Sequence, residues 1–154
     1  MVMRKAVLVS SVSLFVILLS ACGPEDSVDV RFPNGRTVKC EIADTIKEIR
    51  EGLQFHDSLA AERGMLFIYA QENTRVGFYM PKRMKFNLDM IFLDKERKVL
   101  LIEKDLPPCE HQNSADCPTY GPAGKPCKYV VEVVAGLSDE VGLEIGDQLE
   151  FKLP

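Results

Sequence analysis

One polar loop of the chain brings together three residues that could do chemistry. The stretch PPCEHQNSADCPTY holds Cys109, His111 and Cys117 between prolines. These residues could bind a metal, form a reactive thiol with its base, or supply the two halves of a disulfide. With Cys127 they would offer four metal ligands, but the chain has no Cys-x-x-Cys pair, the spacing common in zinc sites and redox-active dithiols. We therefore expect no metal and no cofactor at this loop.

The amino-terminal segment sets the compartment in which these cysteines work. A basic pair at positions 4 and 5 precedes a largely apolar stretch, and small residues then lead into Cys22. This is the layout of a secretory signal peptide, and the apolar stretch is too short for a permanent membrane span. The ending Leu-Ser-Ala-Cys resembles the bacterial lipobox, whose cysteine is lipidated after cleavage. An ordinary signal peptide cleaved near Ala21, which would leave Cys22 as a free thiol, is the alternative.

We expect residues 1–21 to be a lipoprotein signal peptide, residues 22–27 the lipidated cysteine and a tether, and residues 28–154 one β-rich domain. The lipid would hold the domain at a membrane, outside the cytoplasm. Gly23 stands where an aspartate would retain a lipoprotein at the inner membrane, so a bacterium with two membranes would carry it on the outer membrane, facing the periplasm. Cleavage would leave 17 basic and 23 acidic residues, a balance that argues against nucleic acid as a partner.

Four cysteines remain for the exported domain, and an oxidising compartment favours disulfides. They allow three pairings. We favour Cys109 with Cys117, which would clasp a loop that is already hairpin-like, and Cys40 with Cys127, because each lies in or beside a predicted strand. The spacing leaves a Cys117–Cys127 link open as an alternative.

The pattern along the domain alternates between strands and short helices. The segments VDVRF and TVKCEIA alternate apolar and polar residues around an Asn-Gly turn, which predicts a hairpin with Val38, Cys40 and Ile42 on one face. Thr45 and Glu48 then have capping-box spacing, so we expect an amphipathic helix of about three turns, closed by a glycine and lying as a lid on a sheet.

Further strands are predicted at GMLFIY, RVGFYM, LDMIFLD, KVLLIEK, KYVVEVVAG and DQLEFKLP, and their continuous apolar runs indicate burial on both faces. Ser138 could cap one helical turn that ends at Gly142. The expected fold class is mainly β with two short helices (α+β), in one compact domain that is barrel-like or sandwich-like.

One buried acid is expected in this domain. The run NLDMIFLD carries Asp89 into an apolar strand, where an unpaired carboxylate would be costly, and Arg50 at the end of the first helix is the expected partner. Asp89 could be a structural ion pair or a hydrogen-bonded aspartate. It could also form the floor of a binding pocket, with Arg50, Tyr120 and Met80 around it.

Five ordered segments resemble the bacterial and archaeal family called domain of unknown function 192: ADTIKEIREGLQF, GMLFIY, FYM with LDMIFLD, PPC with CPTY, and KYVVEVVAG with GLEIGDQL. The resemblance covers about residues 36–153. It implies a small, mostly β domain, often exported, with no established activity and no agreed catalytic residues. This chain has Tyr79 where tryptophan is usual and Asn87 where proline is usual, and its PKRMK segment lacks the family's Lys-Asn pair and carries an extra residue. A ligand site at that loop, if the family shares one, would be altered here.

Two functional hypotheses follow. The first, which we favour, is a non-catalytic lipoprotein module that binds a small molecule, an envelope polymer or another protein. The second is a small extracytoplasmic hydrolase that uses Asp89 and His111; neither histidine lies in a nucleophile motif such as Gly-x-Ser-x-Gly.

Overall fold

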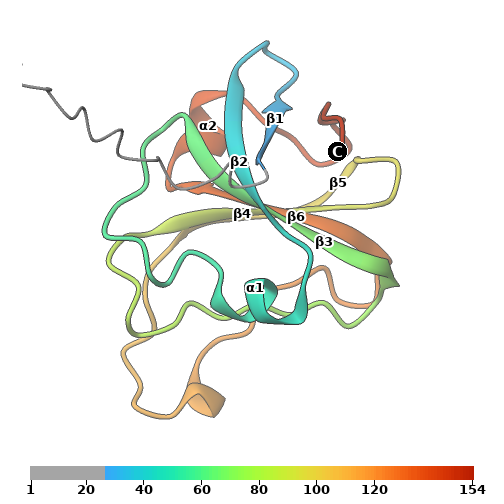
Figure 1. Ribbon diagram of the computed structural model, residues 1–154. Coiled ribbons are helices and arrows are strands. Elements are labelled where there is room, and N and C mark those ends of the chain that lie inside the picture. Colours follow the sequence, from blue (N-terminus) through green and yellow to red (C-terminus); the bar gives the residue numbers. More distant parts are fainter. Residues whose placement is uncertain (1–26) are drawn as a thin grey trace, which may run out of the picture.

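The computed structural model describes residues 27–154 of the chain. The expected signal peptide, the lipidation site at Cys22 and all but the last residue of the tether lie outside these residues. Figure 1 shows a twisted sheet with a few short helices around it. The strands are β1 (Ser27–Arg31), β2 (Thr37–Ala43), β3 (Arg63–Asn73), β4 (Leu88–Leu93), β5 (Val99–Leu106) and β6 (Cys127–Val134). The helices are α1 (Ile46–Glu51), α2 (Leu137–Glu140) and the 3-10 turn η1 (Ser114–Asp116).

The six strands form one mixed sheet in the order β1-β2-β3-β6-β4-β5. β2 and β3 pair in parallel, with α1 in the connection between them, and all other pairs are antiparallel. The sheet does not close, but the carboxyl-terminal segment is hydrogen-bonded beside both of its edges. Glu150 exchanges backbone hydrogen bonds with Arg31 of β1, and the Val99 N–H of β5 donates to the Asp147 carbonyl. The α+β single domain predicted from the sequence is confirmed, in a sandwich-like rather than a closed form.

The first hairpin follows its sequence signal. Val30 faces Val38 across the β1–β2 pair, and Gly35 takes the positive φ of 91° that the turn requires. Val38 and Cys40 are buried on one face, and Ile42 packs against the same cluster. The alternation of the two strands therefore sets which of their side chains enter the core.

Helix α1 begins where the capping box predicts and ends early. The Glu48 N–H donates to Thr45 Oγ1 at 3.2 Å, and the Thr45 N–H donates back to Glu48 Oε2 at 3.1 Å. Gly52, at a φ of 48°, closes the helix after six residues, so the predicted three turns are too many. Leu53, just beyond the cap, is the residue that anchors this lid in the core.

The core has two parts, one on each face of the sheet. On β6, Val131 and Val133 enter the cluster that also holds Cys40, whereas Val130 enters the cluster on the α1 side with Phe67. No helix within residues 27–154 is long and apolar enough to cross a membrane. Within residues 27–154 the six strands of the sheet pack both clusters into one folded domain.

Two predicted strands are absent from residues 27–154. RVGFYM makes only the single bridge from Phe78 to Tyr120 and joins no strand of the sheet. The segment DQLEFKLP bonds alternately to residues near β1 and β5 instead of forming a continuous ladder. Ser138 does not cap α2; its N-cap is Gly136.

One predicted disulfide is present and the other is wrong. Cys109 and Cys117 are bonded, with their Cα atoms 5.8 Å apart, whereas Cys40 and Cys127 are free buried thiols. Cys40 of β2 pairs with Gly64 of β3, and Gly64 pairs in turn with Val133 of β6. Cys127 lies six residues before Val133 on β6. The two cysteines are therefore about 20 Å apart along the strands and about two strand spacings apart across the sheet. They also belong to opposite faces, and a disulfide needs Cα atoms within about 7 Å.

Candidate functional site

A cavity of about 250 Å³ lies between helix α1 and the face of the sheet that α1 covers. Its lining comes from α1, β3, β4, β6 and the irregular segment 77–84. Most of its walls are apolar or aromatic, with the side chains Leu53, Phe67, Phe78, Met80, Met84 and Leu88. A small concave apolar site with a few polar groups is the usual form of a ligand pocket.

Glu132 is the exceptional residue of this pocket. It lies in the middle of β6, directly between Met65 of β3 and Met90 of β4, and it is only 4% exposed. Strand alternation turns it to the same face as Val130, toward α1 and the cavity. Its carboxyl group makes no hydrogen bond or ion pair within residues 27–154. Burial raises the pKa of Glu132 to about 8, so the group is mostly protonated at neutral pH.

The mouth of the pocket is basic. A wider depression of about 650 Å³ adjoins the cavity and shares Arg50 and Tyr79 with it. Lys82 and Arg83 line this depression beside Arg50, and the Arg83 guanidinium lies 5.1 Å from the centre of the Phe55 ring. Cationic groups therefore surround the opening of an apolar cavity.

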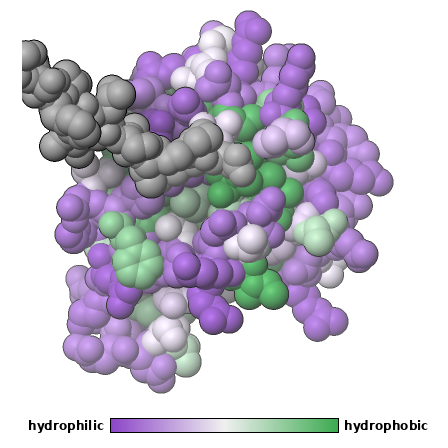
Figure 2. Space-filling model, in the orientation of Figure 1, coloured by the Kyte–Doolittle hydropathy of each residue, from purple (hydrophilic) through white to green (hydrophobic). Residues whose placement is uncertain are grey.

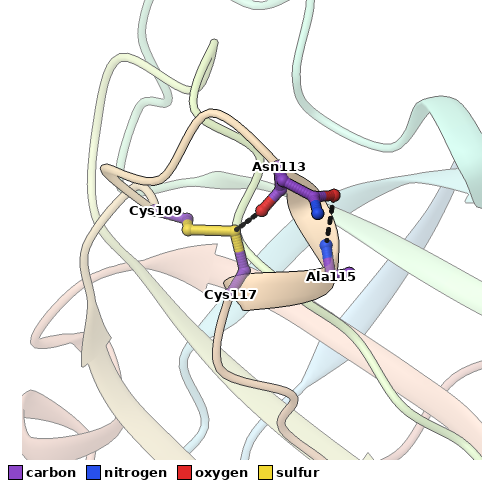
Figure 3. The surroundings of a disulfide bond; sticks show 4 residues. All are labelled: Cys109, Asn113, Ala115 and Cys117. Carbon is purple, nitrogen blue, oxygen red and sulfur yellow. Dashed lines mark hydrogen bonds between the residues drawn. A yellow bond between two sulfur atoms is a disulfide. The ribbon is translucent and has the colours of Figure 1, made fainter.

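The disulfide loop forms a further wall. Figure 3 shows Cys109 joined to Cys117, with the Asn113 side chain accepting the Ala115 N–H at 3.1 Å. The Cys109 N–H donates to the Met80 carbonyl at 3.0 Å, which attaches the loop to the pocket segment. Figure 1 shows that the rest of the loop extends away from the sheet. His111 lies on its exposed part and lines the basic depression with Lys82 and Arg83.

Asp89 is buried as predicted, but its partners are backbone groups. Its Oδ1 accepts the N–H groups of Asp105 at 2.9 Å and Gly136 at 3.2 Å, and its Oδ2 accepts the Ser138 N–H at 2.9 Å. The predicted pairing with Arg50 is wrong. The Asp89 side chain points away from the pocket, on the opposite face of the sheet, because its strand neighbour Met90 is the residue that faces α1.

The residues predicted for one pocket divide between two cavities. Arg50 and Met80 line the cavity that contains Glu132. Met80 also lines an adjoining cavity of about 200 Å³ together with Tyr120 and Cys109, and Asp89 lines neither. Sequence reasoning missed Glu132, although the run KYVVEVVAG places this carboxylate in an apolar strand in the same way as NLDMIFLD places Asp89.

A larger depression is a poorer candidate. This depression of about 690 Å³ on the other side of α1 is lined by several carboxylates and His56. Most of these groups have partners: Glu41 lies 3.3 Å from Arg63 and 3.4 Å from His56, and Glu48 serves the capping box. Within residues 27–154 no three metal-ligating side chains converge on one point. His56 Nδ1 is buried there without a hydrogen-bond partner among the described residues. The cavity with Glu132 is smaller, but it contains a carboxyl group that is almost buried, lies among apolar walls and has no partner within residues 27–154.

The exposed surface carries aromatic side chains beside the mouth of the pocket. Figure 2 shows a face that is mostly hydrophilic, with apolar surface in a few patches. Two exposed aromatic residues, Phe55 at 64% and Tyr79 at 44%, lie at the basic depression beside the pocket. Aromatic surface next to cations is more typical of a recognition site than of a bare solvated face.

Comparisons with known proteins agree on the fold and give no activity. The family model for domain of unknown function 192 (DUF192), described as "Uncharacterized ACR", matches residues 30–151. A crystal structure of a protein of unknown function from Novosphingobium aromaticivorans is 30% identical, with 80% of this chain and 83% of that chain covered and a TM-score of 0.68. A candidate transcription regulator from Sinorhizobium meliloti is 25% identical, with 81% and 92% covered and a TM-score of 0.66. No curated protein matches the chain.

Proposed function

Because the chain belongs to the DUF192 family, whose description gives no activity, we propose its function from the pocket: a non-catalytic module that binds a small molecule beside Glu132. The observation that carries the proposal is the carboxyl group of Glu132, which is buried, unpartnered within residues 27–154 and directed into an apolar cavity. A ligand atom that hydrogen-bonds to Glu132 would give this carboxyl group the partner that it lacks within residues 27–154, so the unpaired group favours binding.

The proposed place of action is the outside of a membrane. The lipobox-like ending at Cys22 and the signal-peptide layout before it support a lipid anchor, and a disulfide in the folded domain fits an oxidising compartment. In a bacterium with two membranes the chain would face the periplasm. The ligand could be a free small molecule, or a group on an envelope polymer or on another protein. The chain has more acidic than basic residues, so we do not propose that it binds nucleic acid as a transcription regulator.

A small hydrolase is the second proposal, and one observation favours it. A carboxyl group whose pKa is raised to about 8 by burial is suited to act as a general acid. Asp89 cannot share this work, because three backbone N–H groups hold it on the other face. The other carboxylate of the pocket, Glu51, lies 3.9 Å from Lys47 in an ion pair at the rim. Binding without turnover therefore remains the better supported function.

A ligand screen tests the binding function directly. Residues 23–154 would be screened by thermal shift, because a ligand that binds the folded state raises the melting temperature. We expect compounds that stabilise the unmodified domain and the Glu144→Gln control, but lose their effect in Glu132→Leu. Glu144 is exposed and lies away from the cavity. If every stabilising compound acts equally on Glu132→Leu, the pocket is not the binding site.

The anchor has its own test. In a bacterial host, the full chain should be found in the membrane fraction with a mass that includes the lipid, and Cys22→Ser should release it from the membrane. A wild-type chain recovered without lipid would contradict this part of the proposal.

A further inference from the structure

The basic mouth of the pocket is unusual for this protein. The whole chain carries a formal net charge of -4. Even so, Arg50, Lys82 and Arg83 gather at one depression, and within residues 27–154 none of them forms an ion pair. Glu51, the acid among them, is engaged by Lys47 at 3.9 Å. Uncompensated cations at a cavity opening create a local positive potential that favours an anion.

The sequence builds this mouth through a tight turn. Met80 and Met84 are buried at 2% and 6% exposure, and the Met84 N–H donates to the Pro81 carbonyl at 2.9 Å. The turn between the two methionines directs Lys82 and Arg83 to the surface. Arg50 approaches from the last turn of α1, where the Gln54 side chain donates to its carbonyl at 2.9 Å. The three cations are thus placed by packed elements and not by a free loop.

The interior of the cavity has the opposite character. Its walls are apolar, and its volume of about 250 Å³ holds about eight non-hydrogen atoms, if each occupies the ~30 Å³ of a water molecule in the liquid. A hydrophilic ion would lose its hydration inside such walls. The cavity therefore fits a short hydrocarbon chain better than a free ion.

We propose that the pocket binds an amphipathic organic anion, with an apolar body of about eight carbon atoms in the cavity and a carboxylate or phosphate at the mouth between Arg50, Lys82 and Arg83. This inference rests on the proposed binding function and names its ligand class. Charge-assisted hydrogen bonds from guanidinium and ammonium groups recognise both acids. Glu132 contributes in its neutral form, as a hydrogen-bond donor to a polar atom on the inner part of the ligand.

Protonation of Glu132 links binding to pH. The titratable groups that line the cavity with it are Arg50 and Glu51 from α1, Tyr69 from β3 and Tyr79. Burial raises the pKa of Tyr69 to about 12, so this phenol stays neutral through the relevant range. As pH rises through about 8, Glu132 gains a negative charge that repels an anionic ligand. At one pH unit above that pKa the protonated fraction has fallen by about tenfold, and the affinity should fall by about the same factor.

The experiment compares probes that differ in one group. Octyl phosphate, octanoate, octylamine, octanol and inorganic phosphate would each be titrated into residues 23–154 by calorimetry at about pH 6.5 and about pH 9. We expect octyl phosphate and octanoate to bind at least about tenfold more tightly than octanol, and octylamine and inorganic phosphate to bind less well than either. The ratio of octyl phosphate to octanoate then shows whether the natural head group is closer to a phosphate or to a carboxylate.

Three variants test the assigned roles. The double variant Lys82→Glu with Arg83→Glu should weaken octyl phosphate binding by at least about tenfold. Lys39→Glu with Lys152→Glu, the same charge change at two exposed lysines outside the pocket, should not. In Glu132→Gln the side chain cannot ionise. For octanoate, which carries the same charge at both pH values, the affinity ratio between them should therefore fall to about one. The Glu144→Gln control should keep the ratio of the unmodified domain.

Each contrary result is distinct. Tighter binding of octylamine at high pH, lost in Glu132→Gln, would mean a cationic ligand paired with Glu132; the anion inference would fail while the binding function stood. Equal affinity for octanol and octyl phosphate would mean that the charged group is not recognised. Equal affinity for inorganic phosphate and octyl phosphate would mean that the hydrocarbon chain is not recognised, and either result would contradict the inference. Binding to phosphatidylglycerol vesicles without binding to octyl phosphate would mean a membrane surface and would also overturn the inference. If no probe binds and the screen gives no Glu132-dependent compound, both proposals fail.

Discussion

Asp89 and Glu132 are buried acids on neighbouring strands whose side chains leave opposite faces of the sheet. Asp89 faces Val133 in the register of β4 and β6, and Glu132 faces Met90. Asp89 accepts three backbone N–H groups, whereas Glu132 accepts none within residues 27–154. The first carboxylate stabilises the fold by tying β4 to the start of α2. The second costs the domain stability because burial raises its pKa, and this difference is why we assign Asp89 to the fold and propose Glu132 for the site.

The asparagine substitution at Asp89 should damage the fold. The new side chain would keep one oxygen but would turn an amide N–H₂ toward backbone donors, so Asp89→Asn leaves at least one buried N–H group unpaired. We expect a loss of about 2–4 kcal/mol in the free energy of unfolding, measured by urea denaturation. Asp94→Asn, at a half-buried turn after the same strand, is the control and should cost less. A stability equal to that of the unmodified domain would show that the three hydrogen bonds are not important to the fold.

Glu132 should give the domain an unusual stability profile against pH. The pKa of Glu132 is raised from 4.5 to about 8 in the folded state, so between these values the folded state binds the proton that the unfolded state has released. Stability is therefore greatest below pH 4.5 as far as this group is concerned, and it falls as pH rises through that window, by at most about 1.4 kcal/mol per pH unit.

Urea denaturation at intervals across this window would measure the slope. Glu132→Gln should remove most of it, because the amide does not titrate, while Glu144→Gln should retain it. A slope that is the same in all three proteins would mean that other groups control the pH dependence.

Local signals in the sequence were sufficient for much of the fold. The Asn-Gly turn and the Thr45–Glu48 capping box specify their own geometry within a few residues, and both are present as predicted. The carboxyl-terminal segment could not be predicted in this way. Its partners, Arg31 and Val99, lie far away in the sequence, and only the assembled sheet brings them together.

The candidate site was predictable in part, for the same reason. The rule that an acid in an apolar strand needs an explanation found Asp89, and applied to the next such run it would have found Glu132. Which face each acid leaves depends on the pairing of β4 with β6, which the sequence does not show. Arg50 therefore lines the cavity that contains Glu132 and does not pair with Asp89, the acid to which the sequence assigned it.

The cysteines should react in a pattern that reports their places in the fold. Burial raises the pKa of Cys40 to about 12 and that of Cys127 to about 11, so both thiols should be inert to alkylation in the folded domain at neutral pH. Unfolding residues 23–154 without a reductant should expose two thiols, and prior reduction should expose four, as counted by mass. Four free thiols before reduction would show that Cys109 and Cys117 are not bonded. No free thiol before reduction would show that Cys40 and Cys127 are bonded as well.

Loss of the Cys109–Cys117 bond should act on stability more than on the sheet. Replacing both cysteines by alanine opens a loop of sequence separation 8, which the chain-entropy model values at about 2.5 kcal/mol. Urea denaturation should show this loss, with the circular dichroism of the sheet unchanged. Replacing the buried Cys40 with alanine is the control for altered packing. Unchanged stability of the double variant would mean that the loop remains ordered without its bond.

Gly64 sets how closely β3 can approach the strand that carries Glu132. A Cβ at this position would lie 2.6 Å from the Glu132 carbonyl oxygen and 3.1 Å from Cys40 Sγ. The first contact is with backbone, which cannot turn aside as a flexible side chain can, so Gly64→Ala must separate β3 from β6 locally. We expect a loss of about 1–3 kcal/mol in the free energy of unfolding.

The separation of β3 from β6 should also change the pocket, because the displaced carbonyl group belongs to Glu132, whose side chain lines the cavity. Gly64→Ala should therefore also weaken the compounds that depend on Glu132, as measured by calorimetry on the folded fraction. Gly124→Ala provides the comparison: its φ of 78° strains the backbone, but a Cβ there meets no neighbouring atom, so it should cost stability without affecting ligand affinity. Equal ligand affinity in both glycine variants and the unmodified domain would show that the β3–β6 spacing does not shape the site.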